Sequence, residues 1–381
     1  MDRNMKKWHS YKLSDVVRFN PSERLLKGEI AKKVPMDLLQ PYTRGISGFE
    51  MASYTGGSKF RNGDTLMARI TPCLENGKTA YVSMLDEDEV GFGSTEYIVF
   101  RNIEGITDNK FVYYFVTSPW FRDIAVKSMV GSSGRQRVQQ AMLENLVVNL
   151  PPLAEQKQIA GILGALDDKI ELNRCINDNL EEQAKALFKS WFVDSDRNEW
   201  VHYELGDITL ITAGGDRPSK YTNKKTIECY VPIYSNGIDN EGLYGYTDVA
   251  KIHEESITIS ARGTIGYVCL RLEPYVPIVR LISIIPNKKE LSAKYLYLWA
   301  LTQNITGTGT TQQQLTVPIF RKTPISIPSD TKLKQFNSIA DPLFSQIESN
   351  KKENIKLSTL RDTLLPKLMS GELSVEEVSL D

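Results

Sequence analysis

The chain has 381 residues, of which 46 are Lys or Arg and 47 are Asp or Glu, so its formal net charge is −1. At about 100–200 residues per domain, this length predicts two or three domains. Apolar residues make up 41% and charged residues 24% of the chain, which argues against disorder, a collagen-like repeat or a coiled coil throughout. Near-neutral charge also argues against a generally basic nucleic-acid coat, but it leaves room for a local basic surface.

The N-terminal segment and the cysteine pattern indicate a compartment. Positive charges in segment 1–9 are not followed by an apolar stretch, so we expect no signal peptide. No run of about 18 apolar residues occurs, so we expect no membrane span. The four cysteines are far apart: Cys73, Cys175, Cys229 and Cys269. This spacing favours the reducing cytoplasm over a disulfide framework, and neither the cysteines nor the three histidines have the spacing of a metal site.

The chain contains an internal repeat. Tyr11, Leu13 and Asp15 recur as Tyr203, Leu205 and Asp207, at an offset of 192 residues. Three further matches follow in the same order: 64–71 with 256–264, 110–115 with 294–299, and 150–159 with 327–336. The offset falls to 177 at the last match, so we expect net deletions in surface loops of the second copy. The repeat is either an old duplication without functional meaning or a pair of modules that mimics a two-fold dimer reading two DNA half-sites.

The first part of each half, 1–150 and 200–328, is rich in β-branched and aromatic runs. The predicted elements are buried strands at 97–100 and 281–285 and short helices at 110–117 and 294–303. We therefore expect each of these parts to fold as a compact α/β globule.

The second part of each half begins after a proline and predicts a long helix. Apolar residues alternate by four and three from Ile159 to Trp191 and from Phe336 to Leu368, which is the pattern of a heptad seam. The seams contain two asparagine pairs, Asn173 with Asn177 and Asn350 with Asn354. If the helices pair antiparallel, these amides face one another and set the register, because a slipped pairing would leave them unsatisfied. The alternative is that the seam is misphased and the asparagines face solvent.

The predicted long helices have a length comparable to a stretch of DNA and a net negative charge. Residues 155–192 would form a helix of ~57 Å, which matches roughly 17 base pairs of B-DNA, so the pair could act as a ruler. The net charge is +3 in 1–150, −4 in 151–199, +2 in 200–328 and −2 in 329–381. The predicted globules are thus mildly basic and the predicted helices mildly acidic.

Four motifs resemble those of type I restriction–modification specificity subunits. The run 150–159, Leu-Pro-Pro-Leu-Ala-Glu-Gln-Lys-Gln-Ile, resembles the opening of their central conserved helix. Segments 167–170 and 186–194 resemble the middle and end of that helix, and 364–373 resembles the close of their second helix. Two departures occur, at 195–197, where Phe-Asp-Pro is common in the family, and at 329–333, where the second helix opens weakly.

The resemblance implies an α/β fold with two globular target-recognition domains joined by two long antiparallel helices in a coiled coil, with a pseudo-two-fold repeat. The implied domains are target-recognition domain 1 at 1–150, the central conserved helix at 151–199, target-recognition domain 2 at 200–328 and the C-terminal conserved helix at 329–381. The implied role is a non-catalytic subunit that chooses the double-stranded DNA sequence and does not touch membranes. Its implied partners are two modification subunits and the restriction subunits, and S-adenosylmethionine, Mg and ATP are expected on those partners only.

Two other functions remain open at this stage. One is the specificity subunit of a related two-subunit restriction enzyme, and the other is a non-catalytic scaffold or an anti-restriction protein that mimics DNA. A DNA mimic should be strongly acidic, which a charge of −1 disfavours.

Catalysis by this chain is disfavoured by its motifs. Asn149-Leu150-Pro151-Pro152-Leu153 lacks the aromatic residue of an amino-methyltransferase motif and is predicted to be a strand end and helix start. Gly91-Phe92-Gly93 is too short for a cofactor loop and is predicted to be a tight turn. The acidic run 86–89 is predicted to lack the partner lysine of a nuclease site and to be a solvated loop.

DNA reading requires Arg, Lys, Asn or Gln at base edges and further contacts to phosphates. The polar turn 131–137 and its counterpart 308–314 are candidates, although glycine could equally make them simple hinges. Their candidate DNA-binding residues are Ser132, Ser133, Arg135, Gln136, Arg137, Thr311, Gln312 and Gln313. Further candidates are Lys59, Arg61, Arg69, Lys78, Arg217, Lys220, Lys224, Lys225 and Arg262. Arg69 and Arg262 match in the repeat, and for these two we prefer a structural ion pair in each copy.

Overall fold

The computed structural model describes residues 8–195, 200–287, 291–305 and 315–378. The chain forms two compact units: unit 1 comprises 1–174 and 351–381, and unit 2 comprises 175–350. Each unit contains a sheet-rich globule and one stretch of each of two long helices, α5 (Leu153–Phe188) and α9 (Asp330–Ser370).

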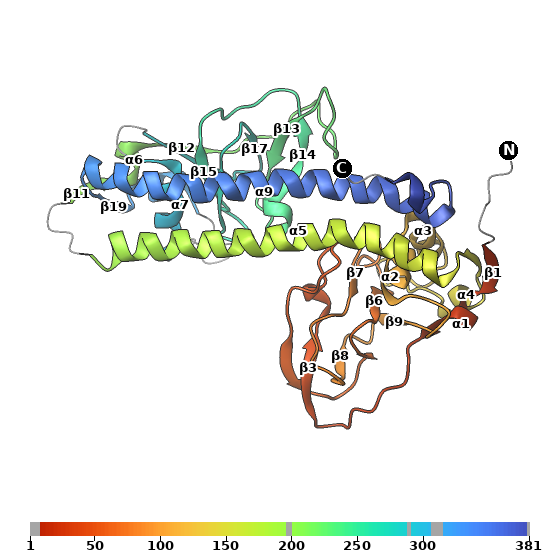
Figure 1. Cartoon of the computed structure of the whole chain (residues 1–381). Helices are drawn as coiled ribbons and strands as arrows, with labels where there is room; N and C mark the ends of the chain where they lie inside the picture. Colours follow the sequence, from red (N-terminus) through yellow and green to blue (C-terminus); the bar gives the residue numbers. More distant parts are fainter. Residues whose placement is uncertain (1–7, 196–199, 288–290, 306–314, 379–381) are drawn as a thin grey trace. The chain divides into compact units, whose positions relative to one another are not determined.

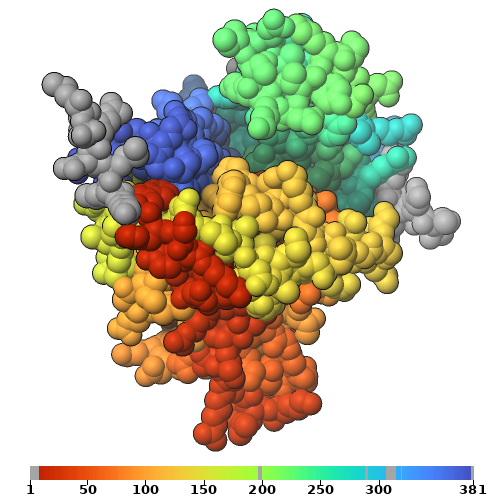
Figure 2. Space-filling model, turned by 90° about the vertical axis from the view of Figure 1, so that its right-hand side faces the viewer, coloured from red at the N-terminus to blue at the C-terminus, as the bar shows by residue number. Residues whose placement is uncertain are grey.

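Unit 1 is built from three sheets. A two-stranded sheet pairs β1 (His9–Lys12) antiparallel with β10 (Val147–Leu150), and Figure 2 shows red residues from near the N-terminus beside yellow residues. The main sheet has the order β2-β9-β6-β7, with bounds Val17–Phe19, Tyr97–Asn102, Thr65–Ala68 and Thr79–Tyr81. The third sheet has the order β4-β3-β8-β5, with bounds Glu50–Ser53, Ile30–Val34, Gly91–Gly93 and Lys59–Phe60.

The short helices of unit 1 are α1 (Leu13–Val16), α2 (Asn109–Thr117), α3 (Pro119–Lys127) and α4 (Gln140–Glu144). Among them, α2 packs on the main sheet and α3 packs against α2. The α2 helix begins where the Asp108 carboxylate accepts the N–H of Phe111, and α3 begins where Ser118 accepts the N–H of Phe121. The predicted helix at 110–117 and the predicted strand at 97–100 are thereby confirmed.

The prediction of a tight turn at Gly91–Gly93 was wrong, because this segment is strand β8. It pairs parallel with β3 and antiparallel with β5. A Cβ on Gly91 would lie 2.5 Å from the ring of Phe60, and one on Gly93 would lie 2.5 Å from the carbonyl oxygen of Val34. The glycines therefore permit close packing inside a sheet rather than a change of chain direction.

Unit 2 repeats this architecture. Its two-stranded sheet pairs β11 (Val201–Glu204) antiparallel with β19 (Pro324–Ile327). Its main sheet has the order β12-β18-β15-β16, with bounds Thr209–Ala213, Ile282–Pro286, Ser256–Ile259 and Val268–Arg271. Its third sheet has the order β14-β13-β17, with bounds Leu243–Thr247, Val231–Tyr234 and Val276–Pro277. The helices are α6 (Leu205–Ile208), α7 (Ala293–Leu301) and α8 (Val317–Arg321). The main sheets of the two units have equivalent strand orders, so the predicted repeat is confirmed as a repeat of structure.

The helices α5 and α9 lie side by side and antiparallel in each unit (Figure 1). In unit 1 they share a core that contains Ile159, Leu163, Leu364 and Leu368. In unit 2 they share a core that contains Phe188, Phe336, Ala340 and Phe344. The predicted helix at 155–192 begins at Leu153, ends at Phe188 and continues as a π-helical turn, Lys189–Val193. The predicted fold class, with two α/β globules and two long antiparallel helices, is confirmed.

Candidate nucleic-acid interface

The basic candidates that precede β6 belong to an ion-pair network in unit 1. The Nε of Arg61 lies 2.8 Å from a carboxylate oxygen of Glu23, and Arg101 binds both Glu23 and Asp64 at 2.6 Å. Lys59 donates to the backbone oxygen of Glu23, and its Nζ lies 5.3 Å from the ring centre of Tyr54. The charge of Arg61 is thus compensated by a nearly buried carboxylate, which makes a structural role the stronger interpretation of this group.

Four of the candidates that follow β6 lie with Glu96 at the opposite end of that strand. We name this group rim 1 and define it as Arg69, Glu96, Arg135, Gln136 and Arg137. Arg137 holds the Glu96 carboxylate with Nη2 at 2.6 Å and Nε at 3.0 Å. This hydrogen bonding holds the pKa of Glu96 below its ordinary value of 4.5. Two residues N-terminal to Arg137, Arg135 is exposed to solvent.

The turn 131–137 is tied to the loop after β6. The N–H of Thr71 donates to the backbone oxygen of Gln136 over 3.0 Å, and the N–H of Gln136 donates to Oγ1 of Thr71 over 2.9 Å. Ser132 and Ser133 are exposed at its tip. The backbone of this turn is therefore held at its base, while its serines and Arg135 remain accessible to a ligand.

Arg69 and Lys78 lie at the two ends of the loop between β6 and β7. The charge of Arg69 helps to lower the pKa of Glu96, and its Nε is buried without a hydrogen-bond partner among the described residues. Lys78 donates from Nζ to the backbone oxygen of Met36 over 2.9 Å. The structure thus brings Arg69 beside Glu96, whereas Lys78 is engaged with a neighbouring loop.

Arg217 in unit 2 lies on an aromatic surface. Its guanidinium carbon is 4.0 Å from the ring centre of Tyr221, and its Nη1 donates to the hydroxyl of Tyr244 over 3.1 Å. Lys220 forms exposed ion pairs with Glu228 and Asp248. Such exposed pairs contribute little to stability, so this segment is more easily rearranged by a ligand than the network around Glu23.

The remaining basic candidates of unit 2 are Lys224, Lys225 and Arg262, and all three are exposed. Thr311, Gln312 and Gln313 lie outside the described residues.

Arg69 and Arg262 are matched in sequence but differ in their surroundings. The N–H of Val138 donates to the carbonyl of Arg69, whereas the N–H of Leu315 donates to the carbonyl of Ala261. By this hydrogen bond, Arg262 lies one residue beyond the backbone position of Arg69. Arg69 directly follows β6 and is half-buried, whereas Arg262 lies in a bend beyond the end of β15 and is exposed.

The asparagines of the helix pair meet within each unit. In unit 1, Asn173 donates to Oδ1 of Asn354 over 2.9 Å and to Glu353 over 2.7 Å. In unit 2, Asn350 donates to Oδ1 of Asn177 over 2.8 Å. Asn173 and Asn350 are buried, so a shifted pairing would leave these amides unsatisfied. A function in setting the register stays a prediction.

The motif at 167–171 fixes the globule of unit 1 to the helices. Asp167 accepts the hydroxyl of Tyr114 over 2.7 Å and Nη1 of Arg361 over 2.6 Å. Burial raises the pKa of Tyr114, and the charge of Asp167 raises it further. The nearly buried Arg44 pairs with Asp168 and with Glu171. Segment 167–170 resembles the middle of the family's central helix, but its sequence did not predict this polar joint with Tyr114, Arg361 and Arg44.

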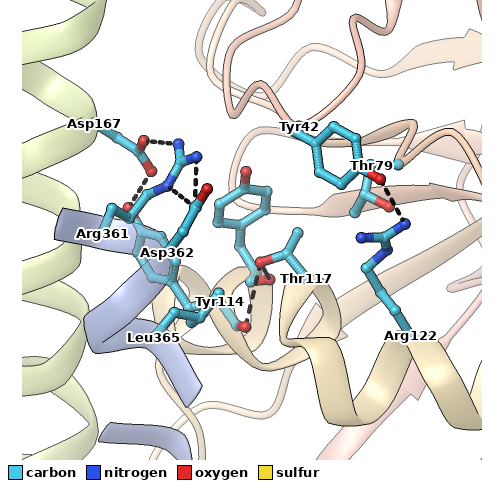
Figure 3. A pocket seen from close by; sticks show the side chains of 11 residues that line it. Tyr42, Thr79, Tyr114, Thr117, Arg122, Asp167, Arg361, Asp362 and Leu365 are labelled. Carbon is cyan, nitrogen blue, oxygen red and sulfur yellow. Dashed lines mark hydrogen bonds and ion pairs between the residues drawn. The ribbon is translucent and has the colours of Figure 1, made fainter. Parts of the chain in front are cut away.

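A small pocket lies beside this joint, and Figure 3 shows its side chains. Tyr42 lies on one side with Arg122, whose Nη2 donates to the Tyr42 hydroxyl over 3.4 Å. Asp167 and Arg361 lie on the other side, bound to each other. The charged groups of this pocket are already bonded to one another or to nearby backbone carbonyls, so its chemistry is that of packing between α2 and the helices.

The acidic run at 86–89 does have a lysine partner, contrary to what its neighbouring sequence suggested. Nζ of Lys32, from β3, lies 2.9 Å from Asp86 and 2.8 Å from Glu89. The lysine comes from a distant part of the sequence, so local spacing could not reveal it.

Within the described ranges, no group of three or more His, Cys, Asp and Glu residues is placed to hold a metal ion. None of the helices in those ranges is long and apolar enough to cross a membrane. The four cysteines are free thiols.

The architecture is that of an internally repeated protein with two α/β globules on a pair of long helices. The family model for the type I restriction modification DNA specificity domain matches residues 5–182 and 197–359. The chain belongs to this family. It is the specificity subunit of a type I restriction–modification system, and such subunits are non-catalytic components of the complex.

Several relatives are similar over most of the chain. The type I restriction enzyme MjaIX specificity subunit of Methanocaldococcus jannaschii is 28% identical over 320 residues, which cover 73% of each chain. The HindI specificity subunit of Haemophilus influenzae is 26% identical over 408 residues, which cover 82% of this chain and 87% of that protein. A crystal structure of a type I S subunit from M. genitalium covers 97% of both chains at 19% identity with a TM-score of 0.54, which supports the fold.

Proposed function

We propose that this chain reads a bipartite target in double-stranded DNA, with one half-site for target-recognition domain 1 (1–150) and the other for domain 2 (200–328). One observation carries the proposal: the main sheets of both units have equivalent strand orders, and arginines lie on turns at the same end of each sheet. Arginine side chains suit both phosphates and guanine edges. The rim 1 turn and the exposed turns of unit 2 are the proposed contact regions.

The helix pair is proposed to set the number of base pairs between the half-sites. The α5 helix has 36 residues and α9 has 41, which correspond to lengths of ~54 and ~62 Å. Because the asparagines pair within both units, a helix cannot slip along its partner without burying unsatisfied amides. The separation of the two recognition domains should therefore follow the number of heptads.

The same helices are proposed to be the docking site of two modification subunits, in a complex that also contains restriction subunits. The proposal follows from membership of the family and from the acidic character of segments 151–199 and 329–381. S-adenosylmethionine, Mg and ATP would act on those partner subunits, and the complex would work in the cytoplasm, where its DNA lies.

Adenine-methylation sequencing of the source cell, with and without this gene, tests the proposed reading. We expect a split motif to lose its methylation when the gene is removed. An unchanged methylome would contradict the proposal that the chain directs methylation. Loss of an unsplit motif would contradict bipartite reading.

Removal of one heptad from each helix tests the ruler. Deleting residues 173–179 from α5 and 348–354 from α9 keeps the seam phase on both sides and removes both asparagine pairs. The helices become shorter by ~10 Å, so the methylated motif should keep its two halves but lose about three base pairs between them.

The matched control keeps the length and changes only the amides. Replacing Asn173, Asn177, Asn350 and Asn354 together by Leu should leave the spacer unchanged. An unchanged spacer after the deletion would contradict the ruler. A changed spacer in this control would show that the amides, and not the helix length alone, set the spacing.

A further inference from the structure

Unit 2 contains a strained turn that carries an exposed arginine. Val279 and Arg280 both have positive φ angles, of 53° and 60°. This region is unfavourable for residues with a Cβ and especially for β-branched ones, and such conformations persist where other contacts enforce them. Val279 is 52% exposed, so burial of its side chain does not explain the conformation.

Backbone hydrogen bonds enforce the turn. The N–H groups of Val279 and Arg280 donate to the carbonyls of Gly215 and Gly214, each over 2.9 Å. A Cβ on Gly214 would lie 2.7 Å from the backbone nitrogen of Ile278. The glycine at 214 therefore lets the two backbones approach closely enough for these bonds to form.

The side chain of Asn236 connects this turn to a second one. Its Nδ2 donates to the carbonyl of Val279 over 2.6 Å, and its Oδ1 accepts the N–H of Ala261 over 2.8 Å. Its backbone oxygen accepts the hydroxyl of Thr264 over 3.1 Å. An amide both donates and accepts, which a carboxylate cannot do. Asn236 thereby joins the turn of Arg280 to the turn of Arg262.

Asn236 is itself held by its own loop. The N–H of Ser235 donates to the carbonyl of Gly242 over 2.8 Å. The buried Arg271 pairs with Glu241 at 3.2 Å and donates to the carbonyl of Glu241 over 2.6 Å. The amide is thus presented from a closed loop, so it can fix the position of the two turns that bind it.

We propose that Arg280 and Arg262 contact the DNA half-site of target-recognition domain 2, and that Asn236 is the positioning residue that holds their turns in place. We name this group rim 2 and define it as Asn236, Arg262 and Arg280. The inference rests on the proposed DNA-reading function and adds two residues, Arg280 and Asn236, that sequence analysis did not select. Both arginines are exposed residues, and the turns that carry them are bonded to the side chain of Asn236.

The test uses the complex of this subunit with its modification subunits and a duplex containing the methylated motif. Arg280→Ala and Arg262→Ala should each weaken binding by roughly 5- to 150-fold, the range for one bidentate contact. If the lost contact is to a phosphate, the slope of log affinity against log salt should fall by about 0.9. Lys322→Ala is the matched control, because Lys322 is an exposed cation of the same unit outside rim 2.

Duplexes with one half-site scrambled separate specific reading from general charge. We expect one of the two half-sites to be read by both arginines. When that half-site is scrambled, neither Arg280→Ala nor Arg262→Ala should weaken binding any further. Unchanged binding, effects on different half-sites, or an equal loss for Lys322→Ala would overturn the inference. A wild-type complex that binds no split motif would instead overturn the proposed function, so the two failures are distinguishable.

Asn236→Asp tests positioning, because it keeps the acceptor for Ala261 and removes the donor to Val279. Discrimination at that same half-site should fall while discrimination at the other half-site stays as in wild type. A purely structural role would lower the melting temperature without changing the ratio of affinities for the two scrambled duplexes. If the variant fails to fold, Asn236→Ser replaces the amide by a shorter hydroxyl and should change the ratio of affinities for the two scrambled duplexes in the same direction. An affinity ratio equal to that of wild type would overturn the positioning role.

Discussion

Units 1 and 2 have main sheets with equivalent strand orders but hold the turns at the ends of those sheets by different chemistry. In unit 1, a carboxylate binds the rim: Glu96 accepts a two-point hydrogen bond from Arg137. In unit 2, an amide and two strained residues take that place, with Asn236 bonded to the Val279 turn. The comparison teaches that packing dictates the sheets, whereas the turns can differ without disturbing them.

The joints between globule and helices differ in the same way. In unit 1, the Asp167 side chain is 3% exposed and that of Arg361 is 11% exposed, so the joint is a buried ion pair. In unit 2, Tyr297 donates to Glu181 over 2.9 Å, and Glu181 also pairs with the half-exposed Lys185. The joint of unit 1 should therefore be the more sensitive of the two to loss of one partner.

The largest expected effect is at the buried joint. Asp167→Ala should lower the free energy of unfolding by about 3 kcal/mol, because it removes the buried carboxylate from Arg361, which keeps only the exposed Asp362, and leaves Tyr114 without its acceptor. Urea unfolding followed by circular dichroism measures it. Glu181→Ala is the matched change in unit 2 and should cost about 1 kcal/mol. Equal losses for the two variants would contradict the difference between the joints.

The second effect concerns the close approach of backbones in unit 2. Gly214→Ala should cost about 1–3 kcal/mol, because its Cβ would meet backbone atoms at 2.7 Å. Gly215→Ala is the control, since the nearest atom to its Cβ is the flexible Lys251 Nζ at 3.6 Å. Thermal unfolding of both variants measures the effect. A Gly214→Ala protein as stable as wild type would show that the Val279 turn does not need this approach.

The third effect is a gain in stability. Val279→Gly should stabilise unit 2 by about 1 kcal/mol, because glycine adopts the positive φ without strain. Differential scanning calorimetry should show a higher melting temperature. No gain, or a loss, would mean that the Val279 side chain contributes contacts that offset its strain.

The smallest effect is at rim 1 and depends on pH. Because the pKa of Glu96 is held below 4.5 in the folded chain, its bond with Arg137 stabilises unit 1 above pH 4.5. That contribution is lost as the pH falls through the lowered pKa. Glu96→Gln should cost about 0.2–1 kcal/mol at pH 7, as is usual for partly exposed pairs, and less at acidic pH.

Unfolding at several pH values, beside Glu228→Gln as an exposed control in unit 2, measures this effect. A pH-independent difference between wild type and Glu96→Gln would argue against the ion pair as its cause. The same variant should raise DNA affinity slightly, because it removes a negative charge next to Arg137.

The sequence by itself determined the two long helices, because these depend on local periodicity, and the repeat, because four matches recur in the same order. The complete fold class was implied by the family resemblance. The seam that runs from Ile159 through Asn173 repeats every seven residues, and such a stripe requires a partner helix. The strand at 97–100 and the helix at 110–117 were equally predictable, since their residues are buried in runs typical of those elements. The family motifs at 150–159 and 364–373 then carried the resemblance.

Only the tertiary structure decided which polar side chains meet. Lys32 binds Asp86, Arg137 binds Glu96, and Asn236 joins two turns, all across long sequence separations. Gly91–Gly93 form a strand in which the absence of side chains lets Phe60 and Val34 pack closely against the backbone. Arg69 and Arg262 were matched in sequence, but in the structure Arg262 lies one residue beyond the position equivalent to Arg69. The physical reason is that a hydrogen bond or an ion pair depends on distances of a few ångströms between elements, which are set by packing of the whole unit and not by the spacing of residues along the chain.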